Sequence, residues 1–172
     1  MDDHQFEQNI RRICHNDREG LKNIYEDYCP LIFSVVSDIL GNREDSEDVT
    51  SEFFIRLWDA ADTYRPGKGH RAWMITIARN MAVDYVRKYR RELPAAELSE
   101  EPEKVSAEDH VCRKLSLEQA LMTLKKEERQ IVNLKIMGEL TFREIAKLLK
   151  KPPGTVAWRY RTAMEKLKEV EL

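Results

Sequence analysis

The strongest constraint on the fold lies in residues 141–167, where helix-breaking residues separate two amphipathic segments. Thr141 and Glu144 have the T-x-x-E spacing of a capping box, in which each side chain satisfies a free backbone donor at a helix start. Residues 152–154, Pro-Pro-Gly, stop the first helix and permit a tight turn. Thr155 is then the expected cap of the next helix. This pattern predicts a helix-turn-helix.

The second of these helices has two chemically different faces at the helical period. Val156 and Ala163 lie on the side that is expected to pack. Trp158 and Arg161 lie opposite, with Arg159 beside them. An aromatic residue and cations near the start of an outward face suit base-edge and phosphate contacts in the major groove of DNA. The alternative is an ordinary helical hairpin whose tryptophan is buried against the first domain.

The rest of the chain also follows the helical period, and no segment alternates in the manner of a β-strand. Apolar residues recur at helical spacing over residues 21–40, Gly41 ends this run, and Pro30 is expected to kink or divide it. Further helices are expected at about residues 45–58 and 70–91. The first domain should therefore contain roughly four helices.

An acidic stretch rich in Ala, Ser and Pro follows at residues 92–110 and offers almost no large apolar side chain for burial. Beyond it, helical spacing marks residues 117–124 and 131–136 as two more helices, which with the helix-turn-helix make four. The expected fold class is therefore all-α: two small helical domains, residues 1–91 and 113–172, joined by an acidic flexible linker at residues 92–112.

Several function classes are excluded by composition. Charged residues make up 35% of the chain, and no uninterrupted apolar run reaches the roughly 18 residues of a membrane span, so we expect no membrane insertion and a cytoplasmic protein. Cys14, Cys29 and Cys112 form no CxxC pair, and the four histidines are scattered, so we expect neither a disulfide framework nor a metal. No nucleophile constellation or glycine-rich phosphate loop appears, which argues against an enzyme and predicts no cofactor.

The net charge of −2 conceals a strong segregation of charge. Residues 1–64 carry 6 basic and 15 acidic side chains, whereas residues 65–91 carry 8 basic side chains against one aspartate. Residues 92–110 carry 1 basic and 7 acidic side chains, and residues 111–172 carry 14 and 8. Two basic segments separated by an acidic one suggest two separate contacts with a polyanion. Solvated helix faces are the alternative for either segment alone.

The first basic segment, residues 63–91, combines a Pro/Gly loop with a long helix. Trp73 and Tyr85 are spaced to pack inward. Asn80 and Arg87 lie on another face. Cations and amides on a rigid helix, beside a loop with aromatic groups that can form a pocket, suit capture of single-stranded nucleic acid. A basic face that only touches phosphate is an equally weighted alternative.

Three motifs occur in order along the chain. The first comprises Asp45, Glu47, Asp48, Val49, Glu52, Phe53, Ile55, Arg56, Leu57 and Trp58; the second comprises Trp73, Ile77, Ala78, Arg79, Asn80, Asp84 and Arg87; the third is the helix-turn-helix of residues 140–167. They resemble the D-x-E-D-V-x-Q-E-x-F-x-R-x-W helix, the W-L-x-x-I-A-R-N-x-x-x-D-x-x-R segment and the C-terminal domain of the extracytoplasmic-function (ECF) sigma factors. The similarity covers nearly the whole chain.

The resemblance implies a subunit that binds core RNA polymerase, through the clamp helices of the largest subunit and the flap, and directs promoter-specific initiation. It also implies control by an anti-sigma factor. The first motif would dock on the polymerase, the second would open and read the minus-ten element, and the third would bind the minus-thirty-five element as duplex. The residues implied are, for polymerase, Asp48, Ser51, Glu52 and Ile55; for single-stranded DNA, Tyr64, Lys68, His70, Arg79, Asn80 and Arg87; and for duplex DNA, Thr155, Ala157, Trp158, Arg159, Arg161 and Thr162.

Some positions depart from the family pattern. Ser51 replaces a glutamine on the docking face, and His70 and Met74 replace phenylalanine and leucine around Trp73. Ala157 and Trp158 replace a basic residue and serine, which predicts a duplex preference particular to this chain. A stand-alone regulator with a ligand-sensing or dimerising first domain is the competing hypothesis, but it leaves the basic helix of that domain without a purpose.

Overall fold

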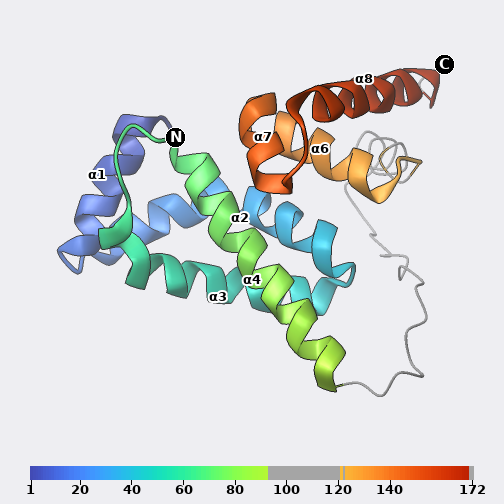
Figure 1. Cartoon of the computed structure of the whole chain (residues 1–172). Helices are drawn as coiled ribbons and strands as arrows, with labels where there is room; N and C mark the ends of the chain where they lie inside the picture. Colours follow the sequence, from blue (N-terminus) through green and yellow to red (C-terminus); the bar gives the residue numbers. More distant parts are fainter. Residues whose placement is uncertain (93–120, 122, 171–172) are drawn as a thin grey trace. The chain divides into compact units, whose positions relative to one another are not determined.

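The computed structural model of the chain describes residues 1–92, 121 and 123–170. The chain divides into two compact units, Met1–Glu103 and Lys104–Leu172 (Figure 1). Every regular element within the described ranges is helical, as the sequence predicts for an all-α fold. The expected linker at residues 92–112, apart from residue 92, and most of the expected helix at residues 117–124 lie outside the described residues. None of the described helices is long and apolar enough to cross a membrane.

Over residues 1–92, the N-terminal unit contains four α-helices and a single 3₁₀ turn. Local caps define their ends: Asp2 and Asp17 accept backbone N–H groups at two helix starts, and Asn42 does so at a third. Gly41 ends the second helix in the left-handed conformation, at φ 81°, as expected from the sequence. The elements are α1 (Asp3–Cys14), α2 (Arg18–Leu40), α3 (Arg43–Ala60), η1 (Ala61–Thr63) and α4 (His70–Glu92).

Helix α2 packs against α1, α3 and α4 and forms the centre of this unit. Ile24, Ile32 and Val36 of α2 are completely buried among these neighbours. Pro30 does not divide the helix, contrary to one of the two outcomes expected, because α2 continues as one element through it with the proline ring exposed. At Gly20 a Cβ atom would come within 2.6 Å of the Asn9 carbonyl oxygen, so the absence of a side chain lets α1 approach α2 closely.

The described part of the C-terminal unit contains α6 (Lys126–Ile136), α7 (Phe142–Leu149) and α8 (Pro153–Val170). Its core is formed by apolar side chains from all three helices, including Ile131, Ile145 and Val156, each fully buried. Helix α8 contributes Ala163, which packs with Leu124 and Val132. Helix α8 contacts both α6 and α7, so one of its faces is used for folding and the other is available for binding.

The turn between α7 and α8 differs from the expected one. Thr141 and Glu144 form the predicted capping box, but the left-handed residue that ends α7 is Lys150, at φ 53° and ψ 44°. Helix α8 begins at Pro153, two residues before the expected cap Thr155, and Gly154 is inside its first turn. The physical reason is that a proline in the first turn of a helix has the required φ and lacks only an N–H group that would have no intrahelical partner.

Replacing Thr141 with alanine should lower the free energy of unfolding of the C-terminal unit by about 1 kcal/mol, because α7 loses its cap. Thr141→Ser keeps the hydroxyl and should retain most of this stability. Hydrogen exchange of α7 amides in urea, compared among the three proteins, measures the effect. Equal protection in the alanine and wild-type proteins would show that the cap does not contribute.

Candidate polymerase and nucleic-acid interfaces

The predicted polymerase-binding residues form one exposed stripe on α3. Asp48, Ser51, Glu52 and Ile55 have i, i+3, i+4, i+7 spacing, and all four are exposed in the structure. Ile55 is 66% exposed, whereas the nearby Phe53 and Leu57 are completely buried. The structure therefore brings together two carboxylates and an unburied apolar side chain on one helix face.

Phe54, for which either a core or an interface role is conceivable, is only 4% exposed. Its ring packs against the ring of Tyr25 from α2, with 4.7 Å between the two centroids. Tyr25 is itself half exposed and covers Phe54 from the solvent side. Phe54 therefore belongs to the core beside the stripe.

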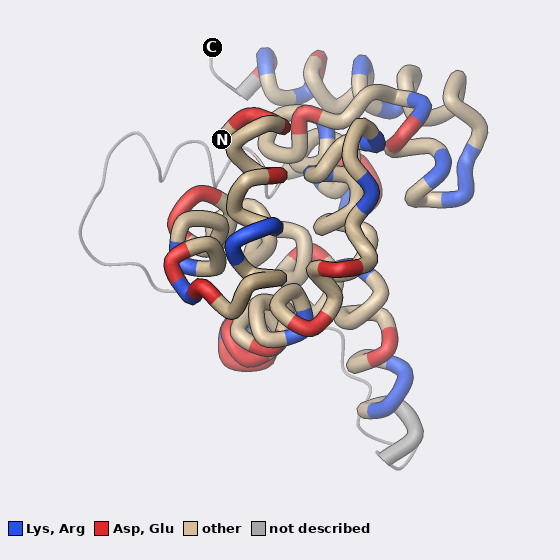
Figure 2. Tube along the Cα trace, turned by 90° about the vertical axis from the view of Figure 1, so that its left-hand side faces the viewer, with Lys and Arg blue, Asp and Glu red and all other residues tan. Residues whose placement is uncertain are grey.

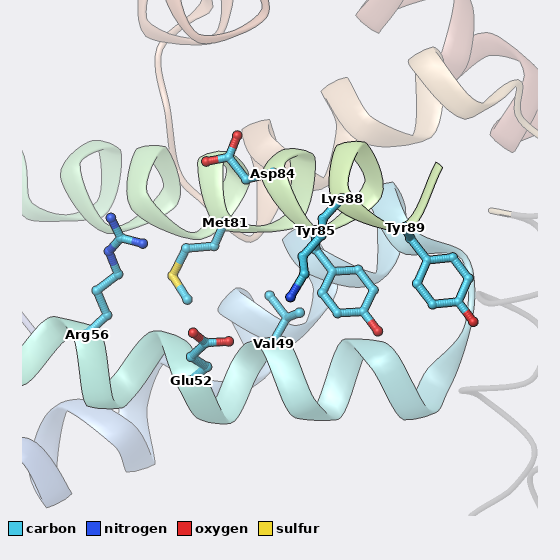
Figure 3. A pocket seen from close by; sticks show the side chains of 8 residues that line it. All are labelled: Val49, Glu52, Arg56, Met81, Asp84, Tyr85, Lys88 and Tyr89. Carbon is cyan, nitrogen blue, oxygen red and sulfur yellow. The ribbon is translucent and has the colours of Figure 1, made fainter. Parts of the chain in front are cut away.

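An open groove of about 450 Å³ lies between α3 and α4, beside the stripe (Figure 3). Glu52 and Arg56 line it from α3, while Tyr85 and Tyr89 point into it from α4 with their rings stacked 6.0 Å apart. The Tyr85 hydroxyl donates a 2.6 Å hydrogen bond to Asp45, and this bond is the main reason that the pKa of Tyr85 rises to about 12. The hydroxyl therefore stays protonated and fixes the start of α3 to α4.

Three of the residues predicted to contact single-stranded DNA are exposed on α4 or in the loop before it. Asn80 and Arg87 are exposed seven positions apart on the helix, and Lys68 is exposed in the loop before it. Arg87 forms a loose ion pair with Asp84, at 3.6 Å, so its guanidinium lies on the same outward face. Gly67 and Gly69, both at φ 77°, give this loop a backbone shape that other residues rarely adopt.

Two other members of that predicted set lie in the core. Tyr64 and His70 are only 6% and 5% exposed, and both contact the ring of Phe6 from α1. The prediction that they face a captured base therefore does not fit this structure, because α1 covers both rings. Phe6 stacks on His70 with 4.6 Å between centroids, and Tyr64 packs against Trp73 at 5.1 Å.

The imidazole of His70 is held at both nitrogens. Nδ1 is hydrogen-bonded to the Asp3 carboxylate, and Nε2 lies 2.5 Å from the Tyr28 hydroxyl. Burial lowers the pKa of His70 below its ordinary value, and the hydrogen bond to Asp3 opposes this only in part. A neutral ring would donate from Nδ1 to Asp3 and accept at Nε2 from the Tyr28 hydroxyl, which also lies 3.0 Å from the Met1 carbonyl oxygen, a second acceptor for its single hydrogen. His70 thus joins the start of α4 to α1 and α2.

Arg79 is half-buried, and its Nε atom has no hydrogen-bond partner among the described residues. Burial lowers the pKa of its guanidinium, although a shift from such a high value leaves the group charged near neutral pH. Arg79 is therefore less accessible to solvent than Asn80 and Arg87, which are both exposed.

In the C-terminal unit, α8 presents the predicted outward face. Trp158 is 61% exposed and Arg161 is also exposed, so neither side chain belongs to the core of the C-terminal unit. Thr155, Ala157 and Thr162 are half-buried along its margins. Arg159 was also predicted to contact duplex DNA. In the structure its guanidinium is ion-paired with Glu127 of α6.

The sequence interpretation missed Glu127, Phe6 and Asp3, which determine the surroundings of predicted site residues. Each contacts residues far away in the sequence, so no local spacing indicated its role. Within the part of the chain that the structure describes, no group of three or more His, Cys, Asp or Glu side chains is arranged to hold a metal ion. The charges of each unit can be followed along the trace in Figure 2.

Comparison with known families agrees with this arrangement. Residues 24–92 match Sigma-70 region 2, and residues 114–167 match Sigma-70, region 4. The first range contains the α3 stripe and α4, and the second contains the helix-turn-helix. The chain belongs to the ECF sigma factors. Members of this family are transcription initiation factors.

Several curated relatives align with this ECF sigma factor over most of both chains. It is 28% identical to the ECF RNA polymerase sigma factor SigW of Bacillus subtilis (strain 168), covering 93% of each chain. It is 26% identical to SigK of Mycobacterium ulcerans (strain Agy99), covering 92% of this chain and 89% of the relative. Identity to RpoE of Cereibacter sphaeroides is 24%, over 90% and 88% of the two chains.

Solved structures share the fold. The sigma factor RpoE in complex with the anti-sigma factor NepR, from Bartonella quintana, aligns with a TM-score of 0.70 at 18% identity, covering 89% of this chain and 96% of that chain. CnrH in complex with the cytosolic domain of CnrY aligns with a TM-score of 0.62 at 17% identity, covering 96% of both. At these identities the comparison supports the helical fold alone.

Acid should destabilise the N-terminal unit of this sigma factor through His70. Because burial lowers the pKa of His70 below 6.5, the unfolded chain binds a proton at pH values where the folded chain does not. The contribution of the neutral ring to stability is therefore complete above the unfolded pKa and is lost as the pH falls from there toward the folded pKa. Urea unfolding at about pH 7.5 and about pH 5.5 measures this loss.

His70→Phe is the matched variant, since it keeps a ring against Phe6 and cannot titrate. Its stability should change less between the two pH values than that of the wild-type protein. His4 and His15 are present in both proteins and cancel in the comparison. The same pH dependence in both proteins would contradict this role of His70.

Proposed function

We propose that this ECF sigma factor docks on core RNA polymerase through the α3 stripe, and contacts promoter DNA through the outward faces of α4 and α8. The observation that carries the proposal is the exposure of Ile55, one turn after Glu52 and two turns after Asp48, on a helix whose other large apolar side chains are mostly buried. An exposed isoleucine bordered by carboxylates suits a protein partner that is basic and apolar.

The chemistry of the stripe fits the clamp helices of the polymerase largest subunit. Carboxylates at Asp48 and Glu52 would steer a basic coiled coil into place, and burial of Ile55 would add affinity that does not depend on salt. Ser51 donates its hydroxyl to the Glu47 carbonyl oxygen at 2.9 Å, so its side chain is already satisfied within α3. Its part in docking would be to leave room for the partner.

For the minus-ten element we propose a contact surface formed by Lys68, Asn80 and Arg87. These residues are exposed, and their amide and cationic groups suit bases and phosphates of an opened strand. Tyr64, His70 and Arg79 would act through the shape of the loop and of the start of α4, since they are buried or half-buried beneath it. Stacking of an unpaired base on an aromatic side chain would then require rings other than those of Tyr64 and His70.

We propose that α8 binds the minus-thirty-five element as duplex DNA and lies in its major groove. Trp158 would contact base edges and Arg161 a phosphate, with Thr155, Ala157 and Thr162 at the margins. Such a factor would work in the cytoplasm with core polymerase. We also propose control by an anti-sigma factor, because two structures with this fold are complexes, with the anti-sigma factor NepR and with the cytosolic domain of CnrY.

Replacing both Asp48 and Glu52 with lysine should weaken binding of the full chain to core polymerase by about tenfold or more, because like charges would face a basic partner. Both side chains are exposed, so the helical fold should persist. Asp62→Lys/Glu169→Lys makes the same change in net charge at exposed sites outside α3 and serves as the control. Pull-down and competition with labelled chain measure the affinity; unchanged binding of the α3 variant would refute the docking face.

Two substitutions on α8 should affect promoter binding in different ways. Arg161→Gln should weaken binding of holoenzyme to all duplexes roughly equally and flatten the slope of log K against log salt by about 1, as for a lost phosphate contact. Trp158→Ala should instead change the preference among minus-thirty-five sequences. Selection from a random duplex library, followed by salt titration, separates the two effects. Identical sequence preference in the Trp158 variant would rule out a base-edge role.

A further inference from the structure

One carboxylate holds two cations of the helix-turn-helix. Glu127 lies in the first turn of α6, Lys151 in the turn before α8, and Arg159 on α8. Lys151 Nζ lies 2.8 Å from Oε1 of Glu127, and the Arg159 guanidinium pairs with Oε2. Each carboxylate oxygen therefore takes one cation. The three side chains connect α6, the turn before α8, and α8 itself.

The exposures of these groups show which of them solvent reaches. Glu127 is 53% exposed, whereas Lys151 and Arg159 are each 28% exposed. The cations are thus the more covered members, and the negative charge is the more open one. A phosphate that approached either cation would meet the Glu127 carboxylate at the same place, and it would have to break an existing ion pair.

The cost of that competition is independent of DNA sequence. Phosphate contacts add affinity for every duplex alike, whereas base-edge contacts discriminate between sequences. Each cation that neutralises a phosphate also releases counterions, which raises non-specific affinity and its salt dependence. A group that occupies two cations within the protein therefore lowers binding to DNA of any sequence, and it leaves the contacts of Trp158 and Arg161 unaffected.

We propose that Glu127 is a specificity-determining residue of the duplex-binding surface, because it keeps Lys151 and Arg159 from pairing with phosphates of non-promoter DNA. The proposal rests on the proposed role of α8 as the duplex reader. It assigns a function to a residue of α6 that is ion-paired with the turn and with α8. The Glu127 carboxylate would limit affinity for DNA, whereas Trp158 and Arg161 on the outward face would supply it.

The test uses the full chain and a fluorescent duplex of mixed sequence that contains no promoter. Glu127→Gln keeps the shape of the side chain and removes its charge. It should bind this duplex about tenfold more tightly at low salt, and its slope of log K against log KCl should become steeper by about 1 to 2, one for each cation released. Circular dichroism and thermal unfolding verify that the variant is folded.

Two further comparisons distinguish release of the two cations from a general change of charge. Glu169→Gln removes one exposed carboxylate near the far end of α8 and should change the slope by much less. In a Lys151→Gln/Arg159→Gln background, Glu127→Gln should add no more than Glu169→Gln does, since no cation remains to be released. Unchanged or weaker binding by Glu127→Gln in the wild-type background would overturn the proposal, because Glu127 would then be neutral or would position the cations for phosphate.

Arg161→Gln, measured on the same duplex, distinguishes failure of this inference from failure of the proposed function. If Arg161→Gln weakens binding while Glu127→Gln changes nothing, the duplex surface is as proposed and the role of Glu127 is wrong. If Glu127→Gln strengthens binding while Arg161→Gln changes nothing, the two cations reach DNA but the outward face of α8 is not the reader.

Discussion

Burial of α2 among α1, α3 and α4 is the interaction on which the N-terminal unit depends. Ile24, Ile32 and Val36 are fully buried there, because the neighbouring helices cover the apolar surface of α2 on several sides. The close approach of α1 at Gly20 belongs to the same packing. Because α3 and α4 each bury one face against α2, each retains an outward face whose residues are not needed for folding, and the proposed binding residues lie on those faces.

Local patterns predicted most of the described helices, but no helix was expected at α1 (Asp3–Cys14). Capping residues and apolar spacing act within a few positions, so α3, α4 and the helix-turn-helix were predicted close to their observed bounds. The turn before α8 was predicted less well. Gly154 has the greatest conformational freedom, but the chain takes the left-handed conformation at Lys150, and the fixed φ of Pro153 begins the helix two residues early.

The candidate surfaces were predictable where a single helix carries them. The outward face of α8 follows from residue spacing, whereas the residues of the α3 stripe were implied by the family resemblance, and the structure exposes both. The same resemblance assigned His70 and Tyr64 to single-stranded DNA, at the two ends of a Pro/Gly loop. Their surroundings are set by Phe6 and Asp3, more than 50 residues earlier, and no periodicity within residues 63–91 contains that information.

The proposed binding faces on α3 and α8 differ in the role of charge, and this difference would allow a chain of net charge −2 to bind a polyanion. On α3, two carboxylates lie beside an apolar residue, so charge would orient the partner while part of the affinity would come from apolar burial that salt does not screen. On α8, the attraction of cations to phosphates would be screened by salt, and Glu127 already neutralises part of the nearby positive charge. Association with polymerase should then persist at ionic strengths where the chain alone leaves DNA. DNA binding would consequently depend on the assembled enzyme, which holds both DNA-contacting faces to one promoter.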